Sequence, residues 1–107
     1  MDAQLKRGVL EICVLAAMRH EDAYGYKLIK DLSPFMEVSE STLYPILKRL
    51  EGSGCVTVYS VEHNGRLRKY YRLTDVGTSK INEFLDGWNS MMEAYSFIKG
   101  DEENDKA

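Results

Sequence analysis

The chain has 107 residues, of which 44% are hydrophobic and 29% charged, and this length allows one domain with a modest core. The formal net charge of -3 would argue against a nucleic-acid partner, but four acids and one lysine lie in residues 101–107. The first hundred residues are therefore balanced, and positive charge is concentrated at Arg66, Arg68, Lys69 and Arg72. Local potential, rather than net charge, steers a polyanion.

Several functional classes lack support in the sequence. Cys13 and Cys55 lie in apolar runs without metal or redox spacing, so we expect buried free thiols and no metal or cofactor. The longest apolar run, residues 9–18, is too short to cross a bilayer, and the start of the chain has no signal-peptide pattern. We expect a cytoplasmic protein with no membrane partner. No set of nucleophile, base and orienting group indicates an enzyme.

Two helices are predicted first. Residues 5–18 are apolar almost all round, which is typical of a helix buried on more than one side, here by a second subunit. Residues 23–32 form the second helix, which we expect Asp22 to cap. It ends at Ser33-Pro34 because the residue before proline avoids the helical region.

A third helix begins within residues 39–42. Its core face follows the helical spacing, and its opposite face is polar or aromatic. Pro45 is tolerable only near the start of a helix, and residues 52–54 end it. The expected core residues are Leu43, Ile46, Leu47 and Leu50, and the opposite face has Ser41, Tyr44, Pro45 and Lys48, flanked by Thr42 and Arg49.

A β-hairpin follows. Residues 55–62 are rich in Val, Thr and Tyr, and residues 67–73 return as the second strand. The Asn64-Gly65 pair between them is a strong hairpin signal. Tyr71 and Leu73 share one face of the return strand, and Arg68, Tyr70 and Arg72 share the other.

A long helix covers residues 75–99, and its apolar residues alternate at spacings of three and four. No other part of the chain is left to cover this stripe, so we expect a partner subunit there. Residues 101–107 are predicted to be an acidic, disordered tail. The predicted dimer interface comprises Ile81, Phe84, Leu85, Trp88, Met91, Met92, Tyr95 and Ile98.

The fold class predicted from these elements is mainly α with a small β-hairpin (α+β). It consists of a winged helix-turn-helix over residues 1–74 and a C-terminal dimerisation helix over residues 75–100. In this fold, the start of the third helix reaches base edges and the basic hairpin contacts phosphates.

Three motifs resemble the PadR family of bacterial transcription regulators, in its short form with one C-terminal helix. They are Tyr24-Gly25-Tyr26, the run from Thr42 to Gly54, and the run from Gly65 to Gly77. The chain departs from the family pattern at Ser41, at Leu67 and in the first wing strand, which lacks a frequent tryptophan. The resemblance implies binding of double-stranded DNA, for which our candidates are Tyr24, Ser41, Thr42, Tyr44, Lys48, Arg66, Arg68, Lys69 and Arg72.

Simpler interpretations exist for the same residues. The hairpin charges are also typical of an edge that resists aggregation, and the polar helix face is also typical of plain solvent exposure. A large aromatic such as Tyr44 opposite the core argues for contact with DNA. The alternative function is a winged-helix module for protein–protein interaction, which a neutral or acidic third helix and wing would favour.

Trp88 supports a second hypothesis. Some short proteins resembling this chain bind flat hydrophobic molecules between paired tryptophans of the two last helices. The candidate effector residues are Phe84, Trp88, Met91 and Met92, since methionines line a cavity adaptably. The alternative is that the seam, meaning the interface between the two last helices, is closely packed and serves only the dimer. We therefore predict a homodimeric repressor whose release by a planar, apolar small molecule depends on this seam.

Overall fold

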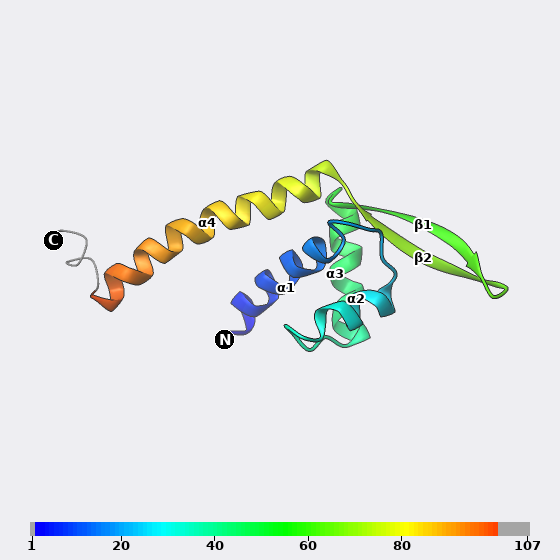
Figure 1. Cartoon of the computed structure of the whole chain (residues 1–107), viewed down its shortest axis with the longest axis horizontal. Helices are drawn as coiled ribbons and strands as arrows, with labels where there is room; N and C mark the ends of the chain where they lie inside the picture. Colours follow the sequence, from blue (N-terminus) through cyan, green and yellow to red (C-terminus); the bar gives the residue numbers. More distant parts are fainter. Residues whose placement is uncertain (1, 101–107) are drawn as a thin grey trace.

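The computed structural model describes residues 2–100, so the predicted acidic tail lies outside the described residues. Figure 1 shows the helices that precede the hairpin gathered in one body, with the long hairpin leaving it at one end and the long last helix leaving it at the other. The molecule measures 66 × 26 × 21 Å. The predicted fold class is confirmed, with helices α1 (Ala3–Ala17), α2 (Gly25–Leu32), α3 (Glu40–Gly52) and α4 (Asp75–Lys99) and strands β1 (Val56–His63) and β2 (Arg66–Leu73).

The core lies among α1, α2, α3 and the base of the hairpin. All four apolar residues predicted for the third helix are buried, each with at most 3% of its surface exposed. They pack with Leu15 of α1, Leu28 of α2 and Val56 of β1. Truncating one such leucine to alanine typically costs about 2–5 kcal/mol, so this core fixes how α3 is presented.

The start of α2 differs from the prediction that Asp22 caps it. Tyr24 occupies the N-cap position and makes no side-chain capping bond. Ala23 instead pairs with Tyr71 of β2, donating its amide at 3.1 Å and accepting at 2.8 Å. This short bridge draws the chain before α2 toward the hairpin. The carboxylate of Asp22 therefore faces β1 and β2 rather than the first turn of α2.

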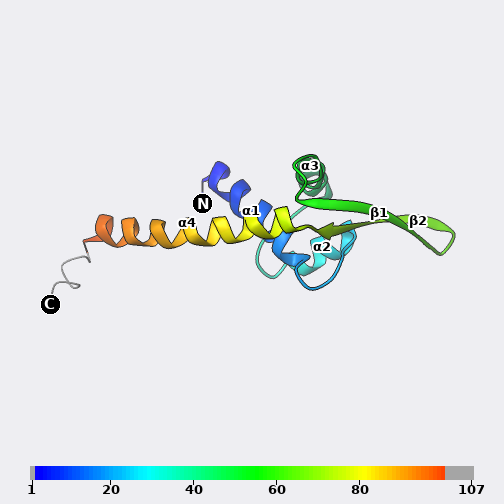
Figure 2. The same cartoon turned by 90° about the horizontal axis from the view of Figure 1, so that it is seen from above.

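The hairpin, which we call the wing (residues 56–73), confirms the predicted turn. Its strands are antiparallel, with Val56 opposite Leu73 and His63 opposite Arg66. Asn64 and Gly65 have φ of 52° and 77°, the left-handed pair that a two-residue turn requires. The turn lies at the far tip of the wing, well away from the helical body (Figure 2).

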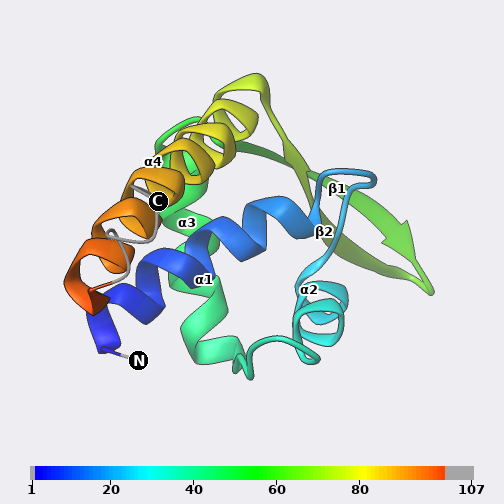
Figure 3. The ribbon, with the colours of Figure 1, turned by 60° about the vertical axis from the view of Figure 1, so that its left-hand side comes forward.

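The last helix begins against the core and then leaves it. Figure 3 shows α1 and α4 side by side, and the two helices pack against each other. Ile81 is only 2% exposed and belongs to the core of its own chain, so its predicted place in a dimer seam is corrected. Its side chain is covered by the core of its own chain and has almost no surface left for a partner. In the described range, no helix is long and apolar enough to cross a bilayer.

Candidate nucleic-acid interface

Four of the predicted site residues meet at one groove. The groove has a volume of about 450 Å³ and lies where the start of α2, the exposed face of α3 and strand β2 converge. We call it the tyrosine groove; it is lined by Tyr24, Gly25, Tyr26, Tyr44, Arg68, Lys69 and Tyr71. It combines two cationic side chains with several phenol rings, a composition that suits a phosphate backbone and the bases beside it.

Aromatic packing holds Arg68 in the groove. Its guanidinium lies 4.1 Å from the centre of the Tyr24 ring. Tyr24 in turn meets Tyr70 edge-on at 5.5 Å, and Tyr70 stacks on Tyr59 at 5.6 Å. A cation over an aromatic face gains about 0.5–1 kcal/mol at an exposed site, so Arg68 is oriented while its charge stays accessible.

A second cluster fixes the base of the wing. The Tyr59 hydroxyl donates a hydrogen bond to the Asp22 carboxylate. Arg72 donates a second hydrogen bond from Nε to the same carboxylate at 3.1 Å, and its Nη2 lies 3.1 Å from Oδ2 of Asp22. The hydrogen bond from Tyr59, followed by those from Arg72, holds the pKa of Asp22 below its ordinary value. Arg72 was predicted as a DNA contact. It has this partner within the chain, although its side chain remains largely exposed.

The exposed face of α3 is arranged as predicted. Tyr44 is 45% exposed, and its ring covers Gly25, where any Cβ would meet the phenol. The Ser39 hydroxyl accepts the Thr42 amide at 3.3 Å and lies 3.0 Å from the Ser41 hydroxyl. Pro45 is the sixth residue of α3, so the Ser41 carbonyl has no amide four residues on. The exposed start of α3 therefore lacks one of the usual intrahelical hydrogen bonds.

The remaining predicted contacts extend beyond the groove. Lys48 lies one helical turn after Tyr44 and is exposed. Arg66 is exposed at the wing tip, beside the turn. Sequence reasoning missed Tyr26, which is 66% exposed at the mouth of the groove, and the Asp22 cluster. The Tyr24-Gly25-Tyr26 repeat was a usable signal for Tyr26, whereas no local pattern pointed to Asp22.

The predicted effector residues lie on α4, away from the groove. Phe84 and Trp88 stack with ring centres 5.9 Å apart and planes 24° apart. Phe84 also lines a cavity of about 370 Å³ between α1 and α4, whose other apolar walls are Leu5, Val9 and Ile12. Met91 and Met92 follow one turn later and are exposed. The arrangement is a partly open aromatic surface beside a largely apolar hollow.

The cysteines are free, as predicted. Cys55 is buried and Cys13 is partly buried, and burial raises the pKa of the Cys13 thiol. In the part of the chain covered by the structure, no three histidine, cysteine or acidic residues are grouped to hold a metal ion.

Both a solved structure and a protein of known sequence are similar to this chain over most of its length. A PadR family transcriptional regulator from Eggerthella lenta has 33% identity and a TM-score of 0.82, covering 91% of this chain and 87% of its own. An uncharacterized protein of Lysinibacillus sphaericus is 30% identical over 100 residues, which are 88% of this chain and 92% of that protein.

A third relative carries functional information. The negative transcriptional regulator PadR of Bacillus subtilis is 29% identical over 82 residues, which are 72% of this chain and 45% of that longer protein. Its structure in complex with operator DNA matches with a TM-score of 0.66 and 27% identity, over 72% of this chain and 46% of that one. The model of the PadR-like family of transcriptional regulators matches residues 14–83. With this match over most of its length, the chain belongs to the PadR-like family of DNA-binding transcriptional regulators.

Proposed function

We propose that this regulator is a repressor that binds double-stranded DNA as a homodimer. The observation that carries the proposal is the tyrosine groove, which joins the exposed face of α3 to the cationic residues of the wing. The negative regulator PadR and its operator complex support repression and DNA contact by this fold.

The two sides of the groove suit different parts of DNA. The first turn of α3, with Ser41, Thr42 and Tyr44, enters the major groove, where the N-terminal residues of a recognition helix contact base edges. Arg68 and Lys69 lie on phosphates of the adjacent backbone, since guanidinium and ammonium groups neutralise phosphate oxygens. Tyr24 positions Arg68 through its ring.

The dimer forms through α4, in keeping with a DNA-binding unit over residues 1–74 and a dimerisation helix over residues 75–100. From Leu85 onward, the apolar side chains of α4 stand exposed in the single chain. An apolar stripe at spacings of three and four is the pattern that a second helix covers. The exposed apolar residues of the stripe are Leu85, Trp88, Met91, Met92, Tyr95 and Ile98.

The same seam accommodates an effector. The stacked pair of Phe84 and Trp88 offers a flat aromatic surface, and the hollow between α1 and α4 adjoins Phe84. Met91 and Met92 adapt to a loosely filled space. A planar, apolar molecule bound there releases DNA if it prefers one of two dimer geometries, because a ligand shifts a population only through differential affinity.

The DNA interface is tested by Arg68→Ala combined with Lys69→Ala. Removing two phosphate contacts weakens binding to specific and random duplexes alike. It flattens the log–log salt dependence of the binding constant by about one to two units. The measurement is a salt titration of duplex binding, for example by fluorescence anisotropy.

The matched control is Arg19→Ala with Lys30→Ala, which removes the same charge from exposed positions outside the tyrosine groove. The control should leave the slope unchanged. An equal slope for the wing variant and the parent would exclude the wing as a phosphate contact and favour a protein-interaction module.

The effector site is tested through Trp88, the only tryptophan of the chain. Flat aromatic cations and phenolic acids should quench its fluorescence saturably and weaken DNA binding over the same concentrations. Because the indole is an essential wall of the site, Trp88→Ala should abolish ligand binding, measured by calorimetry, while the dimer persists. Ligands that bind the alanine variant equally well would contradict the proposed site.

A further inference from the structure

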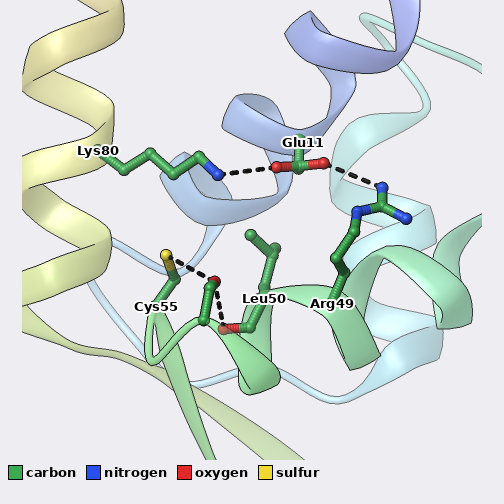
Figure 4. Close-up of polar contacts among 6 residues, drawn as sticks. Glu11, Arg49, Leu50, Cys55 and Lys80 are labelled. Atoms are coloured by element: carbon green, nitrogen blue, oxygen red, sulfur yellow. Dashed lines mark hydrogen bonds and ion pairs between the residues drawn. The ribbon is translucent and has the colours of Figure 1, made fainter.

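One carboxylate joins three helices of the body. Glu11 of α1 accepts a hydrogen bond from Arg49 of α3 at 3.0 Å through Oε2, and one from Lys80 of α4 at 2.9 Å through Oε1 (Figure 4). These contacts span 38 and 69 positions of the chain. Each oxygen serves a different cation, so the carboxylate is shared between two elements.

The carboxylate is ionised and largely shielded. Only 17% of the Glu11 side chain is exposed, against 52% for Arg49 and 41% for Lys80. Burial opposes ionisation, but the hydrogen bonds from Lys80 and Arg49 outweigh it and hold the pKa of Glu11 below its ordinary value. Because this carboxylate is shielded, salt and solvent screen its attraction to the two cations less than they screen an ordinary surface ion pair.

The three helices have different roles in the proposed function. Helix α3 presents the DNA-reading face, α4 carries the dimer seam, and α1 packs beside α4 (Figure 3). In a dimer joined through α4, the separation of the two α3 helices depends on the angle between α3 and α4 in each subunit. Since α4 has 25 residues and is about 37 Å long, a small change of angle at its start becomes a large displacement.

We propose that Glu11 is a positioning residue that sets the spacing of operator half-sites. By binding Arg49 and Lys80 together, it holds α3 at one angle to α4, and the dimer then fits one separation of half-sites. The inference rests on the proposed function as a DNA-binding dimer and adds a determinant of its specificity. The residue does not need to touch DNA.

The experiment begins with the unaltered dimer. It is used to enrich duplexes from a library in which two randomised half-sites are separated by spacers of varied length. Dissociation constants are then measured at the preferred spacer and at spacers one and two base pairs longer and shorter. The ratio of these constants is the spacing discrimination.

Glu11→Gln keeps the shape of the side chain and removes its charge. Spacing discrimination should fall by about three- to tenfold, the range expected for one coupled charge network. Affinity for random duplex should stay within about twofold, because the phosphate contacts of the wing are intact. The matched control is Glu93→Gln, an exposed glutamate of α4 outside the hollow that Glu11 and Lys80 line, which should keep the discrimination of the parent.

A mutant cycle separates positioning from general loosening. Lys80→Gln lies away from the tyrosine groove and should reduce discrimination by the same factor as Glu11→Gln. Combining the two should add little, because both act through one carboxylate. If Glu11→Gln folds poorly, Lys80→Gln alone tests the same link.

The outcomes distinguish two failures. If the parent enriches no paired half-sites, the proposed function as a DNA-binding dimer is wrong, and the inference falls with it. If the parent selects one spacing and both Glu11→Gln and Lys80→Gln keep its full discrimination, the proposed function stands and the role of Glu11 is overturned. Additive losses in the double variant would also overturn it.

Discussion

A few side chains at the base of the wing both hold the fold together and position residues of the candidate nucleic-acid interface. Asp22 receives hydrogen bonds from Tyr59 of β1 and Arg72 of β2, and so ties the loop before α2 to both strands. Tyr24 follows two residues later, with Arg68 over its ring. A carboxylate that does not itself line the groove thus helps to place a candidate phosphate contact.

The residue-scale prediction concerns Asp22 and pH. Its pKa lies below the ordinary value of 3.8 in the folded chain, so the carboxylate stabilises the fold above about pH 4. This contribution is lost as pH falls through the lower, folded value. Asp22→Asn should therefore lower the melting temperature at pH 7, and the difference from the parent should narrow progressively below pH 4.

The measurement is thermal unfolding by circular dichroism at several pH values. Asp86→Asn is the control, since Asp86 is exposed on α4. A melting-temperature difference that stays constant from pH 7 to pH 3 would contradict an ionised partner for Tyr59 and Arg72.

Among the elements, the wing and α4 meet at a closely packed junction. The Thr74 hydroxyl donates to the Gly54 carbonyl at 2.6 Å and accepts the Gly77 amide at 3.2 Å. Gly77 is buried, and a Cβ at this position would overlap the carbonyl oxygen of Cys55. Backbone atoms cannot move aside as a flexible side chain can, so the first turn of α4 requires glycine for close packing.

The element-scale prediction is that Gly77→Ala destabilises the protein by about 2 kcal/mol or more, as overpacking against a fixed backbone does. Chemical denaturation by urea measures the change. Gly52→Ala is the matched control, because no atom lies near the Cβ that it adds. The control should change the free energy of unfolding by less than about 1 kcal/mol. Equal effects of the two substitutions would show that α4 can shift away from Cys55.

The whole molecule is elongated because two of its elements leave the core in opposite directions. The wing extends on one side and α4 on the other (Figure 1). Leu85 is 50% exposed and Tyr95 is 53% exposed, which leaves an apolar stripe along half of α4. A stripe of this kind on a protein of this size favours assembly through that surface.

The prediction at this scale is that the parent is a dimer by light scattering at micromolar concentration and that Leu85→Glu dissociates it. A dimer that has lost its seam should also lose the dependence of melting temperature on protein concentration, since association stabilises only the assembled state. Ser90→Glu is the control, because helical geometry places Ser90 on the opposite side of α4. A parent that is monomeric, folded and cooperative would contradict the proposed assembly.

Much of the fold was predictable because its signals are local. The buried stripe of α3 follows helical spacing, and the Asn64-Gly65 turn follows from the φ values that these residues tolerate. The length of α4 follows from a continuous apolar period. The motifs around Tyr24, Tyr44 and Arg68 indicated the family, and the structure brings these three side chains to one groove.

Other features depended on which distant segments meet. Asp22 was expected to cap a helix. Its carboxylate instead accepts hydrogen bonds from Tyr59 and Arg72, which lie 37 and 50 positions later in the chain. Ile81 has the spacing of the seam, yet its place at the start of α4 buries it in its own core. Glu11 only interrupts an apolar run in the sequence, whereas in the fold it joins α3 to α4. The spacing of apolar residues and the backbone preferences of single residues act within a short segment, so both can be predicted from the sequence. The partner of a charged group is decided by the packing of the whole chain, so only the tertiary structure shows it.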